Sequence, residues 1–199
     1  MKRWIPIGVL ALLVVVGLWV ARGYNDLVQL DQSVRSQWAQ VENVYQRRAD
    51  LVPNLVETVK GAAAFEKETF TAVAEARSQV GRVSAEALQK AANDPEALKR
   101  FQQAQDGLSS ALSRLMAVSE RYPELKATGA FRDLQAQLEG TENRITVERM
   151  HFNEAAQAFN SKRQSFPTVL VVGALGDRFK EKAYFQAQAG AETAPKVKF

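Results

Sequence analysis

The feature that most constrains this chain is an uncharged apolar segment near its N-terminus. From Trp4 to Ala21 the sequence reads WIPIGVLALLVVVGLWVA, eighteen residues without a charged side chain. A helix of about 20 apolar residues crosses a hydrocarbon core roughly 30 Å thick, so the segment has about the minimum length for a transmembrane helix. Trp4 and Tyr24 are separated by about 30 Å of helix axis, which predicts an aromatic belt at each membrane surface.

A cleaved signal peptide is the alternative interpretation of this segment. The tripeptide Ala21-Arg22-Gly23 is a poor small-x-small cleavage site because Arg22 lies inside it. Helical periodicity also continues directly past this point, so we expect an uncleaved membrane anchor over residues 1–23. Lys2, Arg3 and the N-terminal amine outweigh Arg22 across the span, which favours a cytoplasmic N-terminus and a body outside the cytoplasm.

The charge of the body argues against nucleic acid as a partner. The chain of 199 residues has a net charge of +4, but Lys2, Arg3 and Arg22 flank the apolar segment. Without them, 23 basic residues face 22 acidic ones, and such a balance gives little affinity for a phosphate backbone. The sequence has no cysteine, which excludes disulfides and thiolate metal sites.

The remainder of the chain predicts long helices. Apolar residues recur at intervals of three, four and seven over residues 27–59, 65–92, 98–115 and 131–159, and no stretch alternates with a period of two. Asp94 and Pro95 mark a helix start as N-cap and first helical residue. We therefore predict an all-α fold, with the transmembrane helix followed by an antiparallel three- to four-helix bundle of long helices over residues 24–165.

Residues 166–199 form an aromatic C-terminal segment and tail. The stretch 165–185 is too short and too broken to cross a membrane. A solvated tail is rarely so aromatic, so packing back onto the bundle is favoured over an exposed interaction surface. Its aromatic residues are Phe166, Phe179, Tyr184, Phe185 and Phe199, and residues 188–195 have the composition of a linker.

Two polar stripes run along the first and last body helices. Because residues three, four or seven apart share a helix face, we predict that the two stripes meet in an inter-helix network of charge-assisted hydrogen bonds. A solvated face is the alternative. Pro53 is predicted to kink the first helix and to leave the carbonyl of Ala49 for a neighbouring amide or guanidinium. The stripes comprise Asn43, Arg47, Asp50 and Asn54 on the first helix and Glu142, Arg149, Asn153 and Asn160 on the last.

No catalytic constellation is recognisable. Glu148 and His151 form an E-x-x-H pair, but a di-iron bundle needs a second such pair and the chain has one histidine. Gly-rich phosphate loops and nucleophile motifs are missing from the sequence. We expect no enzymatic activity, no catalytic or cofactor-binding residues and no metal.

Several long motifs carry a resemblance to a known family. They are YNDLVQLDQSVRSQWAQVENVYQRRADLVPNLVETVKG (24–61), EGTENRITVERMHFNEAAQAFNSKRQSFP (139–167), FKEKAYF (179–185) and APKVKF (194–199). In these the chain resembles the LemA family of bacterial membrane proteins over nearly its whole length. The resemblance implies one transmembrane helix and a helical-bundle body, and it supplies no enzymatic activity. One branch of the family is linked to building magnetosome membranes, which hints at membrane organisation. Phe152 stands where the family often has tyrosine.

We therefore expect a single-pass protein of the bacterial cytoplasmic membrane that scaffolds or organises membrane proteins. Its partners would be the lipid bilayer and either further copies of itself or other membrane proteins. A membrane-anchored sensor or small-ligand-binding bundle is the alternative, in which Arg47, Asp50 and Arg149 line a polar cleft.

Overall fold

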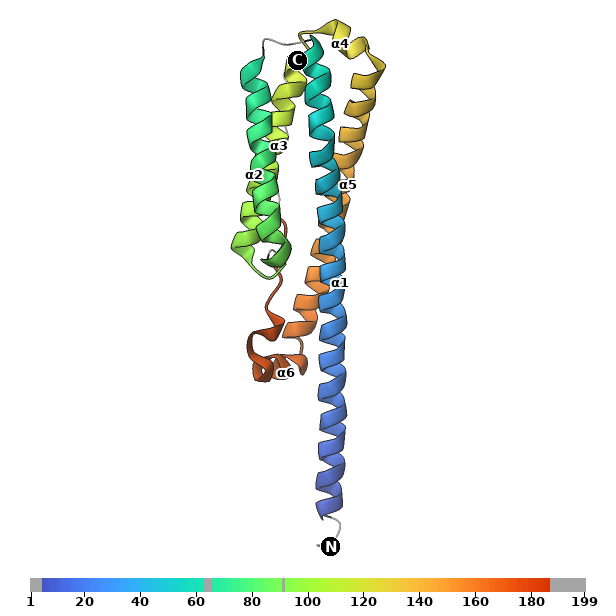
Figure 1. Cartoon of the computed structure of the whole chain (residues 1–199). Coiled ribbons are helices and arrows are strands. Elements are labelled where there is room, and N and C mark those ends of the chain that lie inside the picture. The colour runs from blue at the N-terminus through green and yellow to red at the C-terminus, as the bar shows by residue number, and fades with distance from the viewer. Residues whose placement is uncertain (1–4, 63–65, 91, 187–199) are drawn as a thin grey trace, which may run out of the picture.

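The computed structural model describes residues 5–62, 66–90 and 92–186, and within these ranges the chain is helical with no strand (Figure 1). The predicted all-α class is confirmed. The elements in chain order are α1 (Ile5–Ala62), α2 (Lys67–Lys90), α3 (Pro95–Ser119), α4 (Pro123–Ala127), α5 (Gly129–Gln164), α6 (Thr168–Leu175) and the 3-10 helix η1 (Gly176–Phe179).

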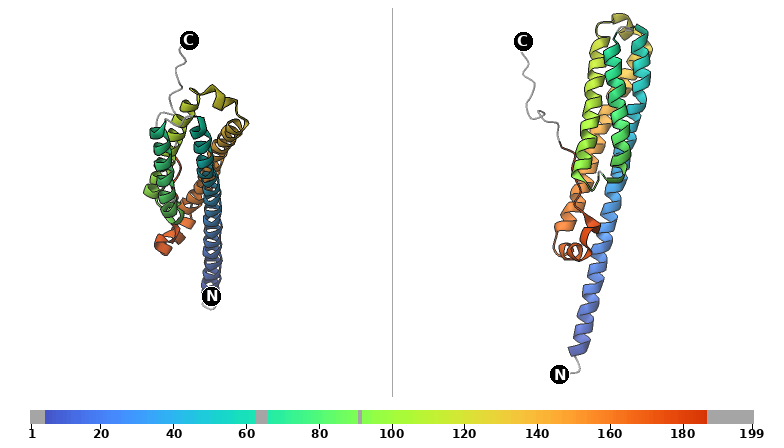
Figure 2. Two further views of the ribbon diagram at one scale, coloured as in Figure 1. Left: turned by 45° about the horizontal axis from the view of Figure 1, so that its top comes forward. Right: turned by 60° about the vertical axis from the view of Figure 1, so that its left-hand side comes forward.

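Helix α1 joins the apolar segment to the bundle without a break. Its 58 residues correspond to about 87 Å of helix axis, and its N-terminal part projects well beyond the other helices (Figures 1 and 2). Residues 7–21 are exposed, and by length and composition this is the one helix of the described ranges able to cross a membrane. Trp4 lies outside the described residues.

The body consists of two antiparallel helix pairs. Helix α1 packs chiefly against α5, and α2 packs against α3 (Figure 1). The Asp94 side chain accepts hydrogen bonds from the backbone N–H groups of Glu96 and Ala97, and Pro95 opens α3, as the sequence predicts. The last long helix begins at Gly129, after Thr128, whose hydroxyl accepts from the backbone N–H of Phe131.

The core divides into a membrane-proximal and a distal cluster. The proximal cluster centres on Trp38, whose ring lies 5.4 Å from Phe101, 5.5 Å from Phe152 and 6.1 Å from Phe185, centroid to centroid. The distal cluster contains α1 residues such as Leu55 together with apolar residues from α2 to α5. The apolar periodicity of the sequence thus marks the buried face of each long helix.

The aromatic C-terminal segment packs back onto the bundle in part. Phe179 and Phe185 are buried in the proximal cluster, as predicted. Phe166, in the turn before α6, is 81% exposed. Tyr184 is 41% exposed, and its hydroxyl accepts a hydrogen bond from the side chain of Asn160 at 2.9 Å. Phe199 and the linker 188–195 lie outside the described residues.

Candidate functional site

A buried arginine joins three helices at the centre of the bundle. Arg48 of α1 is 2% exposed. Its Nη1 donates to Oε1 of Glu142 at 2.6 Å and to Oγ of Ser109 at 2.8 Å. Its Nη2 donates to the backbone carbonyl of Gln105 at 3.2 Å and to the Gln105 side-chain oxygen. The charge is therefore matched by one carboxylate and three neutral oxygens, which offsets its desolvation.

Sequence reasoning missed Arg48, although a signal for it was present. The spacing of the polar stripe singled out its neighbour Arg47, which is exposed. Arg48 instead falls within the apolar series Val41, Tyr45, Val52 and Leu55, at intervals of three and four. An arginine at a core position of a helix is buried only when paired, and this placement could have identified it.

The α1 stripe points largely to water. Asn43, Arg47, Asp50 and Asn54 are all exposed. The carboxylate of Asp50 accepts a hydrogen bond from Gln46, one turn earlier on the same helix, at 2.8 Å. Among the described contacts, Glu142 is the stripe residue that links α5 to α1, and it does so through Arg48.

The α5 stripe holds the end of the chain instead. We call residues 180–186 the C-terminal strap. Asn160 donates to the carbonyl of Lys182 and accepts from its N–H, each at 2.9 Å. Asn153 makes the same pair of bonds to Phe185, at 3.0 and 2.9 Å. Each amide thus satisfies one residue of extended backbone in both directions, as the edge of a sheet does.

Two cations complete the attachment of the strap. Arg149 donates to the carbonyl of Gln186 at 2.9 Å, and its guanidinium lies 4.8 Å from the Phe185 ring centroid. The Lys182 side chain is 3% exposed, and its Nζ donates to the side chains of Asp31 on α1 and Asn93 before α3. The strap therefore ties α1, α3 and α5 together, and its irregular backbone left no periodic signal in the sequence.

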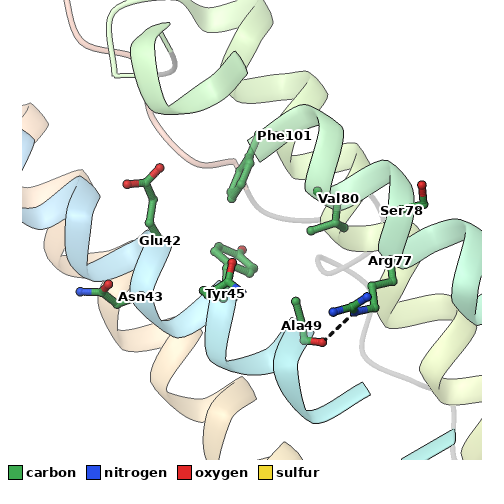
Figure 3. Close-up of a pocket in the computed structure, with 10 residues that line it drawn as sticks. Glu42, Asn43, Tyr45, Ala49, Arg77, Ser78, Val80 and Phe101 are labelled. Atoms are coloured by element: carbon green, nitrogen blue, oxygen red, sulfur yellow. Dashed lines mark hydrogen bonds between the residues drawn. The ribbon is translucent and has the colours of Figure 1, made fainter. Parts of the chain in front are cut away.

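The proline of α1 lies within a continuous helix. Pro53 cannot donate to the carbonyl of Ala49, and Nε of Arg77 on α2 donates to that carbonyl at 3.1 Å (Figure 3). The predicted partner, a neighbouring guanidinium, is thus present. The α-helix continues to Ala62 without interruption at the proline.

A cleft of about 560 Å³ lies between α1 and α2, with Phe101 of α3 on its wall (Figure 3). Its lining includes Glu42, Tyr45 and Arg77. Burial raises the pKa of the Glu42 carboxyl. Burial also raises the pKa of the Tyr45 hydroxyl.

The residues expected to line a ligand cleft make separate contacts. Arg47 lines a shallow hollow with Thr141 and Arg144 of α5, Asp50 pairs with Gln46, and Arg149 holds the strap. The larger cleft between α1 and α2 is built from other residues.

The E-x-x-H pair lies on the surface of α5. Nδ1 of His151 is 3.6 Å from Oε2 of Glu148, and both side chains are partly exposed. Over the part of the chain that the structure describes, no group of three or more metal-ligating side chains gathers around them or elsewhere.

The chain is similar to known proteins over the region that contains these features. The family model described as "LemA family" matches residues 37–199, which include Arg48, α5 and the strap. Magnetosome proteins MamQ 1 and MamQ 2 of Paramagnetospirillum magneticum are each 27% identical over 184 residues, covering 85% of this chain and 67% of theirs. Magnetosome protein MamQ of Magnetospirillum gryphiswaldense is 26% identical over 203 residues, covering 95% of this chain and 74% of its own. The matched region spans most of the chain, and the protein belongs to the LemA family.

Proposed function

We propose that this protein is a non-enzymatic, single-pass membrane scaffold whose helical bundle organises other membrane proteins, in part by self-association. The observation that carries the proposal is the unbroken α1, which is both membrane anchor and central helix of the bundle. The side chains of α1 from Leu27 to Val59 form part of both core clusters. The anchor cannot bend relative to the bundle at these positions without disturbing the core.

This geometry fixes the bundle relative to the membrane. About 30 Å of the roughly 87 Å helix would lie in the hydrocarbon core, which leaves roughly 55 Å of stiff helix beyond it. A rigid spacer of this length suits a protein that holds partners at a set distance from the bilayer. Within the described residues, α1 has no break that could act as a hinge between the anchor and the bundle.

The surface of the anchor supports lipid and protein partners. Residues 7–20 are apolar, and all of them are exposed. In a bilayer this surface is covered by acyl chains or by another transmembrane helix. The nearly neutral body gives no support to nucleic-acid binding.

Self-association is tested with single cysteines, because the chain has none of its own. Val9, Leu13 and Val16 lie on one face of the anchor, and Leu10 and Val14 share another. Oxidative cross-linking in native membranes is expected to give dimers from one face preferentially. Equal cross-linking from every position indicates random collision. That result contradicts the scaffold proposal. The proposal is also contradicted if no cross-links form, the protein has a monomeric mass in detergent and no membrane protein co-purifies with it.

We further propose that the protein lies in the bacterial cytoplasmic membrane with its bundle outside the cytoplasm, on the basis of the flanking charges. Ser110 is exposed on α3, so Ser110→Cys provides an accessible label. Modification of intact cells by a membrane-impermeant thiol reagent is expected. Modification only after permeabilisation would place the bundle in the cytoplasm and reverse this orientation.

The second candidate function, a ligand-binding sensor, is favoured by the cleft between α1 and α2. Its charged and aromatic lining offers both polar and apolar contacts to a small molecule. A thermal-shift screen of small metabolites tests it. A stabilising compound that loses its effect in Ser78→Trp, which obstructs the cleft from an exposed position, supports the sensor. A stabilisation unchanged by that substitution places binding elsewhere.

A further inference from the structure

Helix α6 exposes an apolar surface that the scaffold proposal does not use. Its sequence, TVLVVGAL, contains no charge. Leu170 is 63% exposed and Val169 is 44% exposed, and Phe166, two residues before the helix, is 81% exposed. Large apolar side chains gathered on so short a segment indicate a surface that another molecule covers.

The position of α6 along α1 indicates what that molecule is. A groove of about 590 Å³ separates the two helices, and it is almost entirely apolar. Its α1 wall contains Val16, Trp19 and Val20, and its α6 wall contains Leu170 and Val171. Figures 1 and 2 show α6 beside α1 at the membrane-proximal end of the bundle.

The depth of α6 follows from this contact. Residues 16–21 of α1 are the last six of the uncharged segment, and they extend to about 9 Å along the axis below Arg22. If α1 crosses the bilayer with Arg22 at the surface, α6 lies beside its last turns. The apolar face of an interfacial helix lies about 5–10 Å deep, and the contact with residues 16–21 holds the apolar α6 at the same level.

Aromatic and charged residues mark the same level. The rings of Trp19 and Phe166 lie 6.5 Å apart, and aromatic side chains favour the boundary between headgroups and acyl chains. Arg22 lines a small hollow with Lys162, which pairs with Asp26 at 2.7 Å. Basic side chains at this height can reach lipid phosphates while their stems stay in apolar surroundings.

Contacts within the chain fix α6 in place. The guanidinium of Arg178, just after α6, lies 5.2 Å from the Tyr24 ring centroid. Tyr24 in turn packs edge-on against Phe179, with centroids 5.7 Å apart. Nε of Arg163 donates to the Phe179 carbonyl at 2.8 Å. Because these contacts tie the segment to both α1 and α5, α6 enters the interface whenever α1 spans the membrane.

We propose that Phe166 and α6 form a second membrane contact, embedded in the bilayer interface beside α1, with phospholipid acyl chains filling the groove between the two helices. This inference rests on the membrane-spanning part of the proposed function and is independent of scaffolding. It gives the protein two points of contact with the membrane, which fix the rotation of the bundle about α1 as well as its height.

Depth-dependent fluorescence quenching tests the proposal in the full-length protein. An environment-sensitive probe is attached to Leu170→Cys in vesicles of phosphatidylcholine and phosphatidylglycerol. Two matched controls carry the same probe: Leu13→Cys, 62% exposed in the apolar segment, and Val147→Cys, 44% exposed on the surface of α5. Lipids spin-labelled near the headgroup and aqueous iodide are the two quenchers, and thermal unfolding of each labelled protein verifies its fold.

At Leu170 we expect at least about twofold quenching by the spin-labelled lipid and protection from iodide, as for an interfacial helix. Val147 should show the reverse. Iodide quenching at Leu170 equal to that at Val147, with Leu13 protected from iodide, overturns the proposal. Protection of Leu170 from both quenchers also overturns it, because protein then covers α6. Iodide quenching at Leu13 as strong as that at Val147 would instead show that α1 does not span the bilayer, a failure of the proposed function itself.

Discussion

Replacement of the buried arginine provides the sharpest stability test of the bundle. The substitution Arg48→Met keeps most of the apolar stem and removes the guanidinium, which joins Glu142, Ser109 and Gln105 across three helices. Arg47→Met is the matched control, since it changes the same residue type one position earlier at an exposed site. The two variants lose the same charge, so their difference reports burial and hydrogen bonding.

The expected magnitude follows from the acceptors that lose their donor. The Gln105 side-chain oxygen and the Ser109 hydroxyl accept from Arg48 in buried and part-buried surroundings, whereas the Gln105 carbonyl keeps its hydrogen bond within α3. Each buried unsatisfied group costs about 1–3 kcal/mol. Glu142 is 43% exposed and can be rehydrated. Nε of Arg48 and Nε2 of Gln105 have no hydrogen-bond partner in the native protein, so the native network is itself incompletely satisfied. We therefore take the lower half of the range, about 1.5 kcal/mol for each acceptor, and two acceptors give about 3 kcal/mol.

Thermal unfolding followed by circular dichroism, on the full-length protein in detergent, measures the effect. For a chain of this size, 1 kcal/mol lowers the Tm by about 2–4 °C, so Arg48→Met should lower it by roughly 6–12 °C. Arg47→Met should change the free energy of unfolding by about 0.5 kcal/mol or less. Equal Tm values for the two variants would refute the reasoning, because the buried hydrogen bonds would then contribute nothing measurable.

Three further predictions concern the strap, the proline and the cleft. Asn160→Ala removes both side-chain bonds to Lys182 and should accelerate tryptic cleavage after Lys182 severalfold; unchanged cleavage would show that other contacts suffice to hold the strap. Arg77→Met should lower the free energy of unfolding by about 1 kcal/mol, and much less in a Pro53→Ala background, where the helix regains its own donor; equal losses in both backgrounds would contradict this role. Burial raises the pKa of Glu42, so the folded state binds more protons than the unfolded state and stability falls as pH rises through the titration of this carboxyl. Glu42→Gln should therefore raise the Tm at neutral pH. It should not do so near pH 3, which is about one unit below the pKa of the carboxyl in the unfolded state, because the carboxyl is then protonated in both states. A Tm difference independent of pH would exclude the carboxylate as its cause.

The long helices and their buried faces were predictable from local signals. An apolar residue every three or four positions can be buried only on one face of a helix, and Trp38, Leu55, Phe152 and Phe159 are all in the core. The start of α3 was equally local, since Asp94 caps N–H groups two and three residues away. None of these features depends on which helix lies next to which.

The partners of the polar residues could not be derived in this way. Asn153 and Asn160 share a face of α5, as their spacing predicts, yet they bind the backbone of the strap rather than α1. A side-chain amide can pair with any polar group brought within about 3 Å, so its sequence position defines a direction and not a partner. The partner was decided by the path of the chain after α6.

The sequence by itself determined the apolar anchor, the helical class and the faces that each long helix buries, because these depend on composition and on the 3.6-residue repeat. Only the tertiary structure decided which groups pair with the buried arginine, because those groups come from other helices. The helical repeat already places Arg48 with the apolar series and Arg47 about 100° away from it. The packing of α3 and α5 against α1 brings Gln105 and Glu142 to Arg48 and leaves Arg47 exposed.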